Sequence, residues 1–129
     1  MVEDNKADVF LIKEAVAFHN LHVELHVVED GKLAIDYINR AGEDADAPCP
    51  SLCLLDLNMP IHNGYEVLRH LRENERCKDI PVIIMTSSES SHDRAEMKRL
   101  GADAYFHKPL TYDDFLQIGD LIKTLLARR

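Results

Sequence analysis

Polar side chains that could do chemistry stand at four places in the chain, three of them directly after a short, mostly apolar run. Glu3 and Asp4 lie near the start, and Asp56, Thr86 and Lys108 each follow such a run. If the runs are strands of an open parallel sheet, their carboxyl ends meet at one crevice, where such folds usually place a site. Three carboxylates, one hydroxyl and one ammonium there would form a divalent-cation site with a nucleophilic carboxylate at its centre.

The charges of this set balance only if a cation joins it. Glu3, Asp4 and Asp56 are negative, and Lys108 alone is positive. Like charges about 4 Å apart repel by about 4 kcal/mol at an effective dielectric constant of roughly 20. A divalent cation would restore the balance, and hard cations of this charge prefer oxygen ligands of this kind. We therefore predict a divalent-cation site.

Helices and strands are expected to alternate along the chain. Apolar residues at helical spacing predict helices, whereas short apolar or alternating runs predict strands. The expected helices cover residues 6–18, 33–38, 65–71 and 94–100, followed by one that begins at the Thr111–Asp114 capping box, and the expected strands cover residues 23–27, 52–55, 82–85 and 104–107. A loop is expected over residues 40–50. Strands that alternate with helices indicate right-handed crossovers and a parallel sheet, so the predicted fold class is α/β.

A further central strand should precede Glu3, because the other polar groups of the set all follow strands. Only Met1 and Val2 stand before it. The recorded chain is therefore expected to begin inside that strand, or to have been trimmed there. The length of 129 residues fits one domain.

Composition narrows the classes of function. The formal net charge of -8 argues against nucleic acid, because phosphate contacts need clustered Lys and Arg. No apolar run approaches the roughly 20 residues of a membrane span, and no signal peptide opens the chain. Cys49, Cys53 and Cys77 are odd in number and lack CxxC spacing, so we expect no disulfide and a reducing compartment. A soluble, cytoplasmic protein is predicted.

The ordered set of motifs resembles the receiver domain of two-component response regulators over nearly the whole chain. The resemblance rests on the segments 2–5 (Val-Glu-Asp-Asn) and 55–60 (Leu-Asp-Leu-Asn-Met-Pro) with Gly64, on Thr86–Ser87, and on Lys108–Pro109 with Tyr105. It implies a flavodoxin-like, doubly wound, five-stranded parallel sheet in the order 2-1-3-4-5, with five helices and a truncated first strand. It also implies one receiver domain over residues 1–129 with no output domain.

The resemblance further implies a role for each residue of the set. Asp56 would accept a phosphoryl group from a phosphohistidine of a partner kinase, and Thr86 and Lys108 would contact that group. Mg²⁺ would be held directly by Asp4 and Asp56, by the backbone carbonyl of Asn58, and by Glu3 through water. Apart from accepting the phosphoryl group and losing it slowly, the chain would not act as an enzyme.

Thr86 and Tyr105 would form the switch pair of such a domain. When Thr86 is drawn toward the phosphoryl group, the Tyr105 ring gains room to turn inward. The surface formed by the fourth helix, the fifth strand and the fifth helix then changes. The logic is an existing equilibrium between two states that a new charge biases.

The implied partners are a sensor histidine kinase and a second copy of the chain. The loop over residues 40–50 and the segment 56–60 look like those of small regulators paired with cyanobacterial phytochromes, which implies a light-regulated kinase. Phe115, Ile118 and Leu121 could supply an apolar dimer contact, or they could equally face the core. No nucleic acid and no membrane partner is expected.

Two other classes of protein fit part of the pattern. A phosphatase of the haloacid dehalogenase type also uses a strand-end Asp nucleophile with Mg²⁺, but it needs a carboxylate two residues later as general acid, where Asn58 stands here. A flavodoxin-like cofactor carrier needs a Gly-, Ser- or Thr-rich loop after its first strand to hold phosphate. The acidic segment 3–5 would repel phosphate unless a cation intervenes, so both classes rank below the receiver domain.

Overall fold

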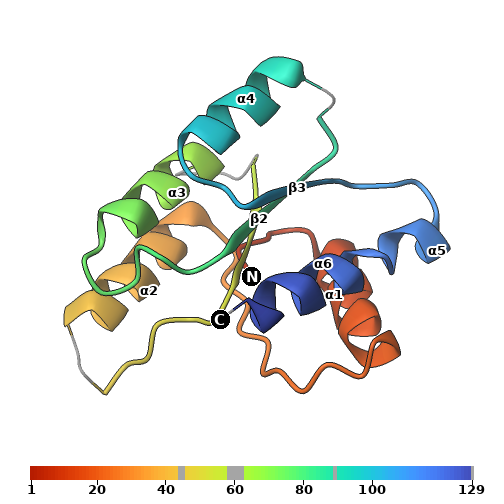
Figure 1. Ribbon diagram of the computed structural model, residues 1–129, viewed down its shortest axis with the longest axis horizontal. Coiled ribbons are helices and arrows are strands. Elements are labelled where there is room, and N and C mark those ends of the chain that lie inside the picture. The colour runs from red at the N-terminus through yellow and green to blue at the C-terminus, as the bar shows by residue number, and fades with distance from the viewer. Residues whose placement is uncertain (44–45, 58–62, 89, 129) are drawn as a thin grey trace.

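A computed structural model describes residues 1–43, 46–57, 63–88 and 90–128. Helices cover both faces of its central sheet (Figure 1). The strands are β1 (Cys53–Asp56), β2 (Val82–Thr86) and β3 (Ala104–His107), and the helices are α1 (Lys6–Phe18), α2 (Gly31–Glu43), α3 (Gly64–Glu73), α4 (Ser91–Arg99), α5 (Tyr112–Phe115) and α6 (Ile118–Ala127). Within the described residues, no helix combines the length and the apolar character that crossing a bilayer requires.

The three strands form a parallel sheet in the order β1-β2-β3. Val2 extends this order beyond β1, because it makes parallel bridges to Leu55 on one side and to Val28 on the other. The spatial order is therefore the segment at Val28, the segment at Val2, β1, β2 and β3. This is the predicted order 2-1-3-4-5.

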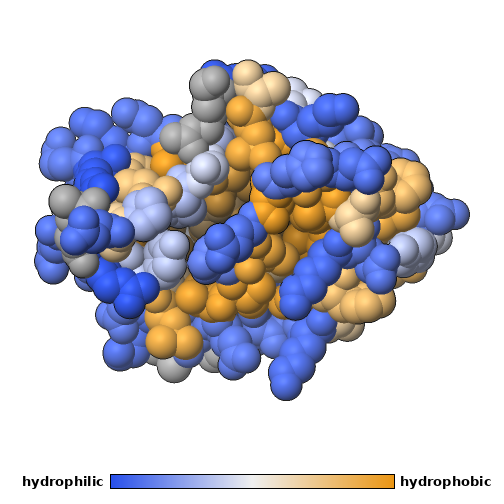
Figure 2. All heavy atoms as spheres, turned by 90° about the horizontal axis from the view of Figure 1, so that it is seen from below, coloured by the Kyte–Doolittle hydropathy of each residue, from blue (hydrophilic) through white to orange (hydrophobic). Residues whose placement is uncertain are grey.

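The predicted strand over residues 23–27 does not form. Val28 alone is bridged, through hydrogen bonds that join it to Met1 and Glu3. A strand needs several consecutive pairs, and the amino group of Met1 reaches only His26 O, at 2.7 Å. A largely apolar cavity of about 440 Å³ lies beside this segment. Figure 2 shows this side of the molecule, where apolar side chains gather and the surface is hollowed.

Residues of the strands alternate between two cores, one on each face of the sheet. Leu55 and Ile84 pack with α2 and α3, whereas Leu54, Ile83 and Met85 pack with α1 and α6. This alternation follows from the two-residue period of a strand. Because both faces are covered, the runs 52–55 and 82–85 contain apolar residues throughout, as parallel strands of this class do.

Several helix boundaries differ from the predicted ones, each for a local reason. The expected loop begins only after Glu43, where α2 ends. Helix α4 begins earlier than predicted, because Ser90 Oγ accepts a hydrogen bond from Asp93 N–H and caps it. The single last helix is instead two segments, α5 and α6, because Gln117 N–H and Gly119 N–H bond three residues back and interrupt the α-helical ladder. The described residues therefore hold six helical segments in place of the predicted five.

Cys49 and Cys77 form a disulfide, so the prediction of no disulfide was wrong. Their Cα atoms lie 5.6 Å apart, within the range that such a bridge requires, although 28 residues separate them in sequence. The fold brings the segment before β1 beside the segment after α3, where Arg76 Nη1 also donates to Ala47 O at 3.1 Å. Cys53 is free and buried in β1.

Candidate functional site

Three carboxylates meet at the carboxyl end of the sheet. Asp56 is the last residue of β1, and Glu3 and Asp4 follow Val2, whose backbone is bonded to Leu54 and Asp56. One oxygen from each of the three carboxylates lies within 4.8 Å of the other two. Glu3 and Asp56 are buried, whereas Asp4 is exposed. The predicted acidic cluster is therefore present, and it is open to solvent at Asp4.

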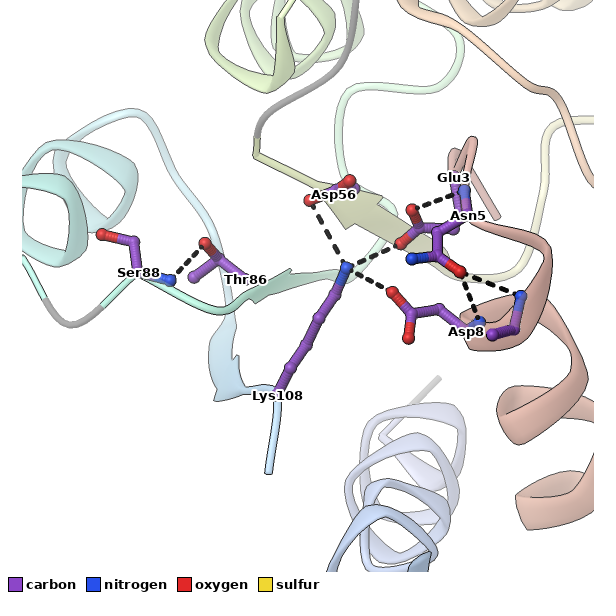
Figure 3. A network of polar contacts seen from close by, with 8 residues as sticks. Glu3, Asn5, Asp8, Asp56, Thr86, Ser88 and Lys108 are labelled. Carbon is purple, nitrogen blue, oxygen red and sulfur yellow. Dashed lines mark hydrogen bonds and ion pairs between the residues drawn. The ribbon is translucent and has the colours of Figure 1, made fainter. Parts of the chain in front are cut away.

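Lys108 joins this cluster from the end of β3 (Figure 3). Its Nζ donates to Glu3 Oε2 at 3.0 Å and to Asp8 Oδ2 at 2.7 Å, and it lies 3.7 Å from Asp56 Oδ1. Its backbone N–H donates to Thr86 O at 2.7 Å, which continues the pairing of β2 with β3. The sheet thus fixes the point from which the Lys108 side chain reaches the carboxylates.

Asp8 is a member of the cluster that sequence reasoning missed. It lies in the first turn of α1, where Asn5 Oδ1 caps the helix by accepting from the N–H groups of Ala7 and Asp8 at 2.9 and 3.2 Å. The cap holds this turn so that Asp8 faces Lys108 (Figure 3). An acidic residue in a first helical turn is ordinarily explained by the helix dipole. The sequence did hold one sign of this role, the capping residue Asn5. It predicts where the helix begins, and therefore that the side chains of the first helical turn lie near Glu3.

Burial governs the protonation of this cluster. It raises the pKa of Glu3 to about 7, and the hydrogen bonds from Lys108 and from Asn5 N–H oppose that rise only in part. Burial by itself would lower the pKa of Lys108, but the bond to Asp8 and the negative charges of Asp56 and Glu3 outweigh it, so that pKa is raised. Among the residues that the structure describes, Lys108 is the ammonium that contacts these carboxylates, and they outnumber it. A set of oxygen donors with this excess of negative charge fits a hard divalent cation.

The two predicted switch residues lie on neighbouring strands. Thr86 ends β2 and is buried, and its Oγ1 accepts a hydrogen bond from Ser88 N–H at 3.0 Å (Figure 3). Tyr105 lies on β3, where it pairs with Ile84. Its hydroxyl oxygen is buried and makes no hydrogen bond of good geometry within the described part of the chain, although the Thr86 side chain is near enough to offset part of the rise that burial causes in its pKa. The Tyr105 ring is therefore turned inward in this structure.

Gly64 places the start of α3 against the end of β1. A Cβ at this position would lie 2.7 Å from Asp56 O, closer than real Cβ atoms approach, and Gly64 N–H donates to Leu57 O at 3.0 Å. Among the predicted site residues, Asn58 lies outside the described residues. Its backbone carbonyl as a metal ligand therefore stays a prediction.

Comparisons with known proteins agree with this arrangement. The chain matches the response regulator receiver domain over residues 1–119. Response regulator Rcp1 of Synechocystis sp. is 34% identical over 118 residues, which cover 92% of this chain and 80% of that protein. The crystal structure of the phosphorylated cyanobacterial phytochrome response regulator RcpA shares 36% identity at a TM-score of 0.87 and covers 99% of this chain and 92% of its own. The Mn²⁺-bound form of Rcp1 shares 33% identity at a TM-score of 0.83, over 95% of this chain and 88% of its own.

The chain belongs to the response regulator receiver domain family. Domains of this family are phosphoacceptor signalling domains that work with histidine kinases, and they are not classical enzymes. The flavodoxin-like fold predicted from the motifs is confirmed by the structural neighbours. The same matches give no support to the phosphatase alternative.

Proposed function

We propose that Asp56 is the phosphoacceptor of this receiver domain. The observation that carries the proposal is the meeting of its carboxylate with those of Glu3 and Asp4, whose oxygens lie within 4.8 Å, and with Lys108 Nζ, 3.7 Å from Asp56 Oδ1. A carboxylate is a weak nucleophile, and phosphoryl transfer is catalysed almost entirely by positioning and charge stabilisation. Both are properties of this cluster rather than of Asp56 alone.

The transfer begins at a phosphohistidine of the kinase. An Asp56 oxygen forms a bond to phosphorus while the P–N bond breaks, and the electron pair of that bond stays on the imidazole nitrogen, which later takes a proton from solvent. Lys108 donates to one phosphoryl oxygen, and the Thr86 hydroxyl donates to another. Attack of water on phosphorus, with Asp56 as the leaving group, would remove the phosphoryl group again, slowly and without the kinase.

Glu3, Asp4 and Asp56 would hold Mg²⁺, with Asn58 adding its backbone carbonyl. The likeness to other receiver domains assigns Asp4 and Asp56 as direct ligands and Glu3 as a ligand through water, which suits Mg²⁺ because this ion often keeps several waters and takes only one or two carboxylates. When bound, the ion would supply positive charge that offsets the negative charge of the carboxylates and of the incoming phosphoryl group. Support comes from the similarity to Rcp1, whose structure is described as Mn²⁺-bound.

The output of phosphorylation is assigned to the surface of α4, β3 and α6. Movement of Thr86 toward the phosphoryl group changes the space around the Tyr105 ring, whose buried hydroxyl makes no hydrogen bond of good geometry within the described residues. A buried hydroxyl without a good hydrogen bond is costly, so a small change of its surroundings can shift the ring between two arrangements. Partner binding to this surface then depends on the state of Asp56.

The kinase partner is proposed to be a light-regulated histidine kinase of the phytochrome type, because RcpA is a phytochrome response regulator with 36% identity. The chain itself is proposed to act in the cytoplasm. A homodimer is a further proposal, but two of the residues first considered for it are unsuitable. Phe115 and Ile118 are buried in the core, and Leu121 is half-buried. The net charge of -8 continues to argue against a nucleic-acid partner.

Incubation with acetyl phosphate and Mg²⁺, followed by intact-mass measurement, tests the proposal. The wild-type protein should gain one phosphoryl group, and Asp56→Asn should gain none while keeping the fold seen by circular dichroism. Asp113→Asn, which makes the same change at an exposed position of α5, should be phosphorylated like the wild type. Uptake by Asp56→Asn at the wild-type level would identify another acceptor, and uptake undiminished in chelator would rule out the metal.

A further inference from the structure

The first turn of α4 joins three separate parts of the molecule through Asp93. Tyr65 Oη, on α3, donates to Asp93 Oδ1 at 2.6 Å, and Ser88 Oγ donates to Asp93 Oδ2 at 3.0 Å. The backbone N–H of Ser88 in turn donates to Thr86 Oγ1 at 3.0 Å. A continuous chain of hydrogen bonds therefore runs from α3, which begins at Gly64 against Asp56, through α4 to the Thr86 hydroxyl.

Arg94, the residue after Asp93 in the first turn of α4, contacts Tyr105, the second residue of the switch pair. The Arg94 guanidinium carbon lies 4.9 Å from the centre of the Tyr105 ring, a cation–π distance. Because the buried Tyr105 hydroxyl makes no hydrogen bond of good geometry within the described residues, the inward position of the ring needs support from other contacts. Arg94 can give that support only while the turn that carries it is held in place.

We propose that Asp93 is a positioning residue, a latch that holds the first turn of α4 so that the Thr86 hydroxyl is oriented and the Tyr105 ring is kept inward. The latch consists of Tyr65, Asp93 and Ser88. It deepens the proposed function, on which it rests, because it links the phosphoacceptor end of the sheet to the partner surface. Asp93 is not a member of the acidic cluster of Glu3, Asp4 and Asp56, and its side chain bonds to Tyr65 and Ser88, so its role is to position other residues and not to take part in the transfer.

Only a carboxylate fits this role. Asp93 accepts on both oxygens at once, from a phenol and from an aliphatic hydroxyl. An amide offers one acceptor oxygen, so Asp93→Asn must lose one of the two bonds or its charge assistance. The bonds from Tyr65 and Ser88 also hold the pKa of Asp93 low, and burial together with the bond to Asp93 raises the pKa of Tyr65 to about 12. At neutral pH the pair is therefore an ionised carboxylate that accepts from a neutral phenol.

A simpler role for Asp93 would be to stabilise the helix start. It lies in the first turn of α4, where an acidic side chain interacts favourably with the helix dipole, and Ser90 Oγ caps its N–H. A residue with that role alone would lower stability when replaced, without a specific effect on Tyr105. The state of the Tyr105 ring therefore separates the two roles.

NMR of protein with ¹³C-labelled tyrosine rings, recorded before phosphorylation, is the test. Tyr65→Phe, Asp93→Asn and Ser88→Ala should each move the Tyr105 ring signals, and amide exchange in the first turn of α4 should rise about tenfold, as expected for losing one bond to a charged group. Ser88→Thr keeps the hydroxyl and should restore the wild-type signals. Asp113→Asn, the same change in the first turn of α5, should leave them in place.

Unchanged Tyr105 signals in both Tyr65→Phe and Asp93→Asn would overturn the latch, as would equal shifts in Asp113→Asn. Tyr65→Phe removes one oxygen and keeps the ring. It therefore provides the test of the latch if Asp93→Asn folds poorly. Asp56 should still accept a phosphoryl group from acetyl phosphate in these variants, because Asp56, Lys108 and the other carboxylates of the cluster are unchanged, but more slowly, because the Thr86 hydroxyl that Ser88 N–H contacts is less well oriented. The Tyr105 signals are recorded in unphosphorylated protein. The NMR test of the latch is therefore independent of the test that identifies Asp56 as the phosphoacceptor.

Discussion

At the scale of single residues, the positive charge of Lys108 allows the carboxylates of the site to be buried close together. Its ammonium donates to Glu3 and Asp8 and lies 3.7 Å from Asp56. The Glu3 side chain has no exposed surface, and that of Lys108 is 14% exposed. A buried carboxylate without a counter-charge is strongly disfavoured, so in metal-free protein Lys108 is the cation on which a charged Glu3 depends.

Replacing Lys108 by Ala should therefore lower stability far more than loss of an exposed lysine. We expect Lys108→Ala to reduce the free energy of unfolding in chelator by about 1–3 kcal/mol, the cost of removing the hydrogen-bond partner of buried charged groups. The loss stays below that of a lone buried charge because Glu3, whose pKa is about 7, can take up a proton. Urea unfolding measures this loss. Lys123→Ala, at an exposed position of α6, should stay within about 0.5 kcal/mol of the wild type. Equal losses in the two variants would show that Lys108 has no special electrostatic role.

At the scale of elements, the site was predictable wherever a polar residue ends a buried run. Asp56 and Thr86 are each the last residue of a strand that both cores cover, so the position of the polar residue at the strand end is visible in the sequence alone. Asp8 was not predictable in this way, because its role depends on how the first turn of α1 packs against Lys108. The run over residues 23–27 has the alternation of a strand but meets too few partner residues to form one. Whether a segment finds a neighbouring strand to pair with depends on the whole fold, so it cannot be predicted from the residues of that segment alone.

The disulfide shows the same limit for the segments that join the elements. Cysteine count and spacing gave no sign of a bridge, yet packing of α2 against α3 brings Cys49 beside Cys77. The bridge ties the segment that leads into β1 to the one that leads into β2. It lies at the amino ends of these strands, away from the carboxyl end that holds the site.

Opening this bridge should destabilise the domain without changing its site. Closure of a loop of 28 residues is worth about 3.6 kcal/mol in the chain-entropy treatment, so reduction, or the double change Cys49→Ala and Cys77→Ala, should lower the unfolding free energy by about that amount. Thermal unfolding with and without dithiothreitol measures the effect. The double variant should not respond to the reductant. A wild-type protein whose unfolding is likewise unaffected by reductant would contradict a stabilising bridge.

At the scale of the whole molecule, the site lies where the two cores share one sheet. Leu54 and Leu55 of β1 face opposite cores, and the same strand ends at Asp56. A cation held there would bind only the folded chain, because the three carboxylates converge only when the sheet is formed. It would also reduce the repulsion within a chain of net charge -8. Binding at the site should therefore stabilise the entire domain.

Magnesium should accordingly raise the unfolding temperature, through binding rather than through ionic strength. At a free concentration of about one hundred times the dissociation constant, linkage gives about 2.7 kcal/mol of added stability. Differential scanning calorimetry in MgCl₂, compared with NaCl at matched ionic strength, separates the two causes, because screening acts equally in both salts. Asp4→Asn removes the exposed carboxylate of the cluster and should lose most of the magnesium-specific gain, whereas Asp113→Asn should keep it. An equal rise in the two salts would mean that the cluster does not bind the ion and that the gain is screening alone.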